Sequence, residues 1–170
     1  MKPQIKKILY ATDFSKNSSY AFLYAVDLAR RYDAQMVILH VMELPPSFTY
    51  GGFSGGKLPD EVQMKRRERT VEALKEQLQG FCVRAEAQIG PPCADLVVRI
   101  VVLAGHPPEE ILNTANDQSC DVIVLGTHGK GFLAHTFLGS VSDAVLHRAR
   151  KPVFLIPLPS ETTAVDWDRI

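Results

Sequence analysis

Five short runs of apolar residues alternate with longer amphipathic segments along this chain. Several of the runs carry Val, Ile and Leu at consecutive positions, which is typical of strands buried on both faces of a parallel sheet. Strands that run parallel need long crossover connections, and helices usually provide them. The alternation therefore predicts an α/β fold with an open parallel sheet and helices on both faces. The runs are residues 8–11, 36–42, 96–104, 122–125 and 153–156.

The segments between these runs have the spacing of amphipathic helices. Phe22, Ala25, Val26 and Ala29 fall at positions i, i+3, i+4 and i+7, and Ser15 ahead of them is a candidate N-cap. Proline is tolerated in the first turn of a helix, so the Pro-Pro-Glu-Glu stretch after the third run marks a helix start. The helical patterns lie within residues 15–29, 61–88, 107–115 and 142–150.

A glycine-rich stretch separates the fourth run from the last helix. Gly126, Gly129, Gly131 and Gly139 lie in it, and Ser140 follows directly. A strand, a glycine loop and a helix in this order can present bare N–H groups and a helix N-terminus to an anion such as phosphate. Ser140 can also cap the helix. The alternative interpretation is structural: the glycines only permit tight turning and the serine only caps.

Composition limits the function classes open to a chain of 170 residues, for which one domain is the default. Nineteen basic and nineteen acidic residues balance, so no overall charge attracts nucleic acid or an anionic membrane. The three cysteines lack the C-x-x-C spacing of a zinc site and are odd in number, which argues against a disulfide framework. A reducing cytoplasm fits this usage, and we expect neither a signal peptide nor a membrane span.

Two other motifs occur in unsuitable places. Residues 52–56 fit G-x-S-x-G, but the nucleophile elbow of hydrolases needs a strand before it and a helix after it. Residues 129–134 fit G-x-G-x-x-A, but no acidic residue follows about 20 positions later to bind a ribose. No Walker P-loop occurs. A serine hydrolase, a dinucleotide enzyme and a P-loop enzyme are therefore disfavoured.

The longest pattern is Gly126-x2-Gly129-x9-Gly139-Ser140. With it the sequence resembles the universal stress protein family, in the ATP-binding branch that carries G-x2-G-x9-G-[ST] after its fourth strand. The opening ILYATDFS of residues 8–15 also resembles the family's first strand with its terminal aspartate. Residues 120–126 and 151–157 match as well, and the resemblance covers about residues 4 to 158.

The resemblance implies a single-domain sheet of strand order 3-2-1-4-5, with ATP at the crevice where the order reverses. It further implies a homodimer that pairs through the last strand, Val153 to Ile156. Asp13 would lie near the ribose or a Mg²⁺ ion brought by ATP, and the backbone of Val41 near the adenine. The expected nucleotide-binding residues are Ala11, Thr12, Asp13, Val41, Gly126, His128, Gly129, Gly139, Ser140 and Val141.

The chain departs from the family pattern in two segments. Residues 45–59 form a long glycine- and proline-containing connection, either a lid over the nucleotide edge or a surface insertion. Residues 132–138 carry His135 where many relatives have a basic residue, so Lys130 is the fixed positive charge of the motif. We expect micromolar or weaker affinity for ATP. The family-like domain is expected over residues 1–158, with residues 159–170 as a C-terminal extension.

The sequence thus predicts a cytoplasmic, ATP-binding stress or regulatory factor that hydrolyses ATP slowly or not at all and acts on an unknown protein partner. An interaction module that binds no nucleotide is the alternative. A third interpretation, a nucleotide α-hydrolase or adenylating enzyme, usually requires a Ser/Gly-rich loop after the first strand. Residues 13–19 contain serine there but no glycine.

Overall fold

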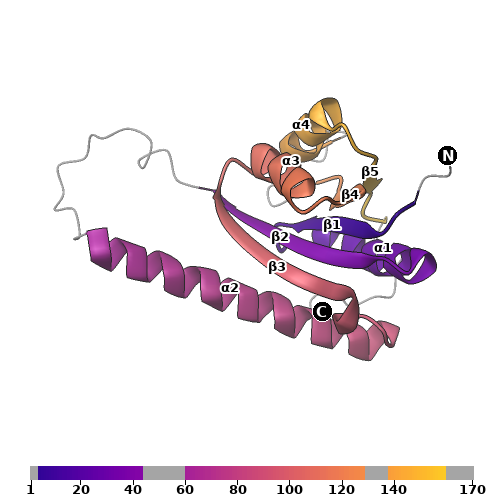
Figure 1. The fold of residues 1–170 in the computed structure, drawn as a ribbon, viewed down its shortest axis with the longest axis horizontal. Coiled ribbons are helices and arrows are strands. Elements are labelled where there is room, and N and C mark those ends of the chain that lie inside the picture. The colour runs from indigo at the N-terminus through magenta and orange to yellow at the C-terminus, as the bar shows by residue number, and fades with distance from the viewer. Residues whose placement is uncertain (1–3, 44–59, 129–137, 160–170) are drawn as a thin grey trace.

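The computed structural model describes residues 4–43, 60–128 and 138–159. Strands and helices alternate along the chain, as the sequence predicts (Figure 1). A short 3-10 helix, η2, precedes the third strand. In chain order the elements are β1 (Lys7–Thr12), α1 (Lys16–Tyr32), β2 (Gln35–Glu43), α2 (Asp60–Ile89), η2 (Ala94–Leu96), β3 (Val97–Gly105), α3 (Pro107–Asp117), β4 (Val122–Gly126), α4 (Ser140–Arg148) and β5 (Val153–Ile156).

The five strands form one parallel sheet in the order β3-β2-β1-β4-β5. This confirms the predicted order. The order reverses between β1 and β4, because the chain first moves outward through β2 and β3 and then crosses back to the other side of β1. The carboxyl ends of β1 and β4 therefore lie side by side, and a crevice at that edge is the usual ligand position in such sheets.

Helices cover both faces of the sheet, as Figure 1 shows. On one face α1 and α2 pack against the strands, and Phe22 and Phe81 meet there with ring centroids 4.8 Å apart. On the other face α3 and α4 place Ile111 and Val145 over Leu9, Leu39 and Ile123. Alternate residues of the buried strands thus serve two separate cores, which explains why the apolar runs are continuous.

Local signals fix the starts of α1 and α3. Ser15 caps α1, because its side chain accepts a hydrogen bond from the backbone N–H of Ser18. Pro107 and Pro108 open α3 as predicted. At α4 the expectation that Ser140 caps the helix is wrong. Gly139 occupies the cap position with an extended backbone, φ −70° and ψ 153°, and Ser140 is already the first helical residue.

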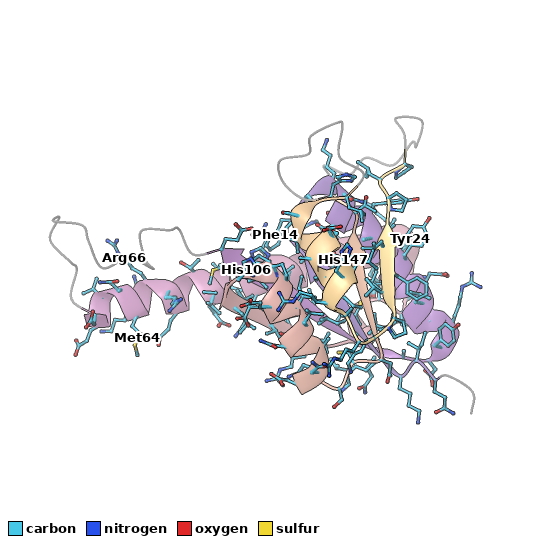
Figure 2. All side chains as sticks on the ribbon, turned by 90° about the horizontal axis from the view of Figure 1, so that it is seen from above. Phe14, Tyr24, Met64, Arg66, His106 and His147 are labelled. Atoms are coloured by element: carbon cyan, nitrogen blue, oxygen red, sulfur yellow. The ribbon has the colours of Figure 1, made fainter. Side chains whose placement is uncertain are left out.

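The last helix ends earlier than expected, and the second helix extends beyond the sheet. α4 ends at Arg148, before the expected end at residue 150. Ala149 has an extended backbone, and a proline follows at position 152. α2 is 30 residues long, and its first part extends beyond the sheet in Figure 1. Met64 on that part is 64% exposed, and Figure 2 shows Met64 and Arg66 there, away from the rest of the molecule. Residues 45–59, expected as a lid or insertion, lie outside the described residues, as does most of the 159–170 extension.

Candidate functional site

A cavity of about 590 Å³ opens at the carboxyl edge of the sheet, where the strand order reverses. The ends of β1, β2 and β4 and the starts of α3 and α4 form its walls. Of the ten residues expected to bind nucleotide, nine line it, and the tenth, Gly129, lies outside the described residues. The nine are Ala11, Thr12, Asp13, Val41, Gly126, His128, Gly139, Ser140 and Val141.

Further residues line the cavity that the sequence did not single out. Ser18 reaches it from α1, Ser142 from α4, and Pro107 and Ile111 from α3. At the end of β2, His40, Met42 and Glu43 line the cavity in addition to Val41. A signal for these β2 residues was available, since they lie at the end of the second apolar run, at the same edge of the sheet as Asp13. The additional lining residues are Ser18, Leu39, His40, Met42, Glu43, Pro107, Ile111, Leu125, Leu138 and Ser142.

The turn between β1 and α1 presents Asp13 at one side of the cavity. Asp13 Oδ1 accepts the backbone N–H of Ser15 at 3.0 Å, and Thr12 Oγ1 accepts that of Phe14 at 3.1 Å. Phe14 adopts a left-handed backbone with φ +62°. This conformation is costly for an aromatic residue and persists only where the surroundings fix it. The two side-chain bonds supply part of that constraint, so the Asp13 carboxylate has a set orientation.

The start of α4 forms another part of the cavity wall. The N–H of Gly139 donates to the main-chain oxygen of Thr127 at 2.8 Å, which joins the α4 start to the residue that follows β4. Ser142 Oγ donates to the Gly126 oxygen at 2.7 Å in a buried contact. The first N–H groups of a helix have no acceptor within it, and they form its positive end. Gly139, Ser140 and Val141 bring this end to the cavity wall.

The start of α3 has the opposite character. Pro107 and Pro108 carry no N–H, and the N–H groups of Glu109 and Glu110 both donate to the His106 oxygen. Two acidic side chains lie in this first turn. Of the two helix starts at the cavity, that of α4 therefore suits an anion, whereas Pro107 and Ile111 offer an apolar surface.

Gly126 lies in β4 without the positive φ that would require glycine for turning. A Cβ at this position would lie 2.8 Å from Cγ and Oδ1 of Asn17, which is too close for a real contact. The suggestion that Gly126 serves tight turning is therefore wrong. Its missing side chain makes room for a buried amide of α1.

Among the described residues, no group of three or more His, Cys, Asp or Glu side chains is arranged to hold a metal ion. Asp13 and Glu43 are the carboxylates that line the cavity in this part of the chain. No helix in the described ranges has the length and apolar character needed to cross a bilayer.

Comparison with known proteins settles the family. Residues 4–157 match the universal stress protein family. The chain belongs to this family. It is 28% identical over 163 residues to universal stress protein MJ0577 of Methanocaldococcus jannaschii, covering 92% of this chain and 97% of that one. It is 33% identical over 153 residues to a universal stress protein encoded 3' of the QAH/OAS sulfhydrylase of Thermus aquaticus, covering 89% and 98%.

Solved structures of universal stress proteins have the same fold. The structure of MJ0577 superposes with a TM-score of 0.71 at 25% identity, covering 92% of this chain and 98% of that one. A universal stress protein in complex with cAMP gives 0.58 at 20% identity, covering 90% and 97%. The Archaeoglobus fulgidus protein in complex with dAMP gives 0.52 at 22% identity, covering 91% and 99%. The similarity to the cAMP and dAMP complexes shows that the fold is shared.

Proposed function

We propose that this universal stress protein binds ATP in the cavity at the carboxyl edge and acts as a nucleotide-dependent regulatory factor in the cytoplasm. The observation that carries the proposal is the start of α4. This positive helix end, with Gly139 and Ser140 in the cavity wall, faces a cavity of about 590 Å³ at the position where the strand order reverses. Small-molecule sites commonly occupy about 300–1,000 Å³, so a nucleotide fits the space.

The different chemical character of the α3 and α4 starts suggests how the nucleotide is oriented in the cavity. Phosphates belong at α4, where backbone N–H groups and the positive helix end favour anions. The base and ribose belong toward β2 and α3, where Val41, Met42 and Ile111 provide apolar contacts and a backbone edge. In this orientation Asp13 faces the ribose hydroxyls or a Mg²⁺ ion carried by ATP, since a bare triphosphate would be repelled by its carboxylate.

Two fold neighbours support nucleotide binding, because their structures hold cAMP and dAMP. Those ligands share an adenine and a phosphate with ATP. For this chain we infer nucleotide binding from the geometry of its own cavity.

We propose that hydrolysis is slow or absent. A general base must be within reach of an attacking water and able to accept its proton. Asp13 and His128 are the candidates that the sequence offers, and both are already engaged. Asp13 Oδ1 accepts the Ser15 N–H, and His128 Nδ1 lies 3.0 Å from the Thr127 hydroxyl. One polar atom of each side chain is therefore already held by a protein contact.

Isothermal titration calorimetry of the purified chain with ATP and Mg²⁺ tests the proposal. We expect a dissociation constant in the micromolar range or weaker, and competition by ADP. Absence of heat at millimolar ATP would refute nucleotide binding and favour the alternative of a nucleotide-free interaction module.

We also propose a homodimer that pairs through β5. This strand lies at the edge of the sheet, and Phe154 on it is 39% exposed. An edge strand with exposed apolar side chains can pair with another copy of itself. Analytical ultracentrifugation should show a dimer, and Phe154→Lys should shift it to monomer. A native monomer at high micromolar concentration would refute the dimer without affecting the nucleotide proposal.

A further inference from the structure

Asn17 is a buried polar residue in the first turn of α1, with 5% of its surface exposed. Its amide joins segments that are more than 100 positions away in sequence. Nδ2 donates to the main-chain oxygen of Ile156 at 2.9 Å. Oδ1 accepts the N–H of His128 at 2.8 Å and the hydroxyl of Thr127 at 3.3 Å. The side chain thus connects the last residue of β5 with the first two residues after β4.

The amide has little freedom to move from this position. It lies against Gly126, where a Cβ would come within 2.8 Å of its Cγ and Oδ1. On α4, the Ser142 hydroxyl donates to the Gly126 oxygen. Side chains from α1 and α4 therefore hold the end of β4, and both hydrogen-bonding ends of the Asn17 amide have partners.

Thr127 connects the same contacts to the start of α4. Its N–H donates to the Ile156 oxygen at 3.0 Å, and its own oxygen accepts the N–H of Gly139 at 2.8 Å. The oxygen of Ile156 thus receives two donors, one from Thr127 and one from Asn17. His128 and Gly139, which both line the cavity, are positioned through this cluster.

We infer that Asn17 is a positioning residue for the phosphate side of the cavity. It does not line the cavity among the described residues. It acts by fixing the peptide between Thr127 and His128 relative to β5, so that the segment leaving β4 starts in the direction that brings the α4 start to the ligand. This inference rests on the proposed function, because it assigns a role in ATP binding at that same site.

The test compares Asn17→Ala with the native chain, using adenosine and ATP as separate ligands. Replacing a residue that positions the phosphate side should weaken the binding of ATP more than the binding of adenosine, because adenosine makes no phosphate contacts. We expect at least about a tenfold loss of affinity for ATP and less than about threefold for adenosine. Thr127→Val is a smaller change that removes one hydroxyl. It should shift the ratio of ATP affinity to adenosine affinity in the same direction.

Asp121→Ala is the matched control. Asp121 Oδ2 accepts the N–H groups of Lys6 and Lys7, so it also bridges distant segments, but at the amino end of the sheet. This variant should lose stability and leave the ratio of the two affinities unchanged. Equal losses for ATP and adenosine in the Asn17→Ala and Thr127→Val variants would overturn the inference and leave ATP binding in place. A native chain that binds neither ligand would overturn the proposed function and the inference with it.

Discussion

The imidazole Nδ1 of His40 lies 2.8 Å from the main-chain oxygen of Thr12. Since a carbonyl oxygen only accepts, Nδ1 carries the hydrogen in this bond. The His40 ring also contacts Phe14, with centroids 4.5 Å apart. A side chain of β2 therefore holds both the last residue of β1 and the strained residue of the following turn, with Asp13 between them.

His40→Ala should weaken ATP binding and lower the free energy of unfolding by about 1 kcal/mol, because it removes a half-buried hydrogen bond. His40→Asn retains a donor close to the Nδ1 position and should recover most of the loss. Urea unfolding and calorimetry measure the two effects. Equal losses in both variants would assign the stabilisation to the ring contact with Phe14 instead of the hydrogen bond.

Gly126→Ala should destabilise the protein by about 1–3 kcal/mol, because the added methyl overlaps the Asn17 amide and overpacking costs this much. Gly80→Ala is the matched control within α2. A methyl there meets the flexible end of Arg84 at 3.1 Å, and alanine is favoured over glycine in a helix by about 0.8–1.0 kcal/mol. The same substitution should therefore have opposite signs at the two sites in urea unfolding. A neutral Gly126→Ala would show that Asn17 can move aside.

Ser140→Glu should change affinity and stability in opposite directions. A carboxylate in the first turn of α4 interacts favourably with the helix dipole, by about 0.3–1 kcal/mol at low salt. The same charge repels a phosphate at this end, so ATP should bind about tenfold more weakly or worse. Ser140→Gln controls for size, and adenosine affinity should stay constant. Unchanged ATP affinity in Ser140→Glu would show that the phosphates do not bind at the start of α4.

Glu86 should contribute to acid sensitivity. Its carboxylate accepts the N–H groups of Ala94 and Cys93, both at 2.8 Å, and these bonds hold the pKa of Glu86 below its ordinary value of 4.5. A depressed folded pKa gives stability that is complete above the unfolded value and is lost as the pH falls through the folded value. Glu86→Gln should flatten the pH dependence of unfolding below pH 4.5. If the free energy of unfolding had the same pH dependence in the native chain and in Glu86→Gln, this assignment would be contradicted.

Much of the fold was predictable because its signals are local. The apolar runs have the density of buried parallel strands, and the cap at Ser15 and the prolines at the α3 start act through neighbouring backbone groups. Nine expected site residues line one cavity because strand ends in a parallel sheet share an edge. The strand order was predicted from the family resemblance, because the residue patterns predict the strands but not which of them become neighbours.

The sequence by itself determined the alternation of strands and helices, the glycine segment after β4 and the polar residues that follow β1. Only the tertiary structure decided that the missing side chain of Gly126 makes room for Asn17, that His40 holds the turn at Thr12, and that Gly139 rather than Ser140 caps α4. The reason is physical. Periodicity and capping depend on residues a few positions apart, whereas these contacts depend on which strands and helices become neighbours in the folded sheet.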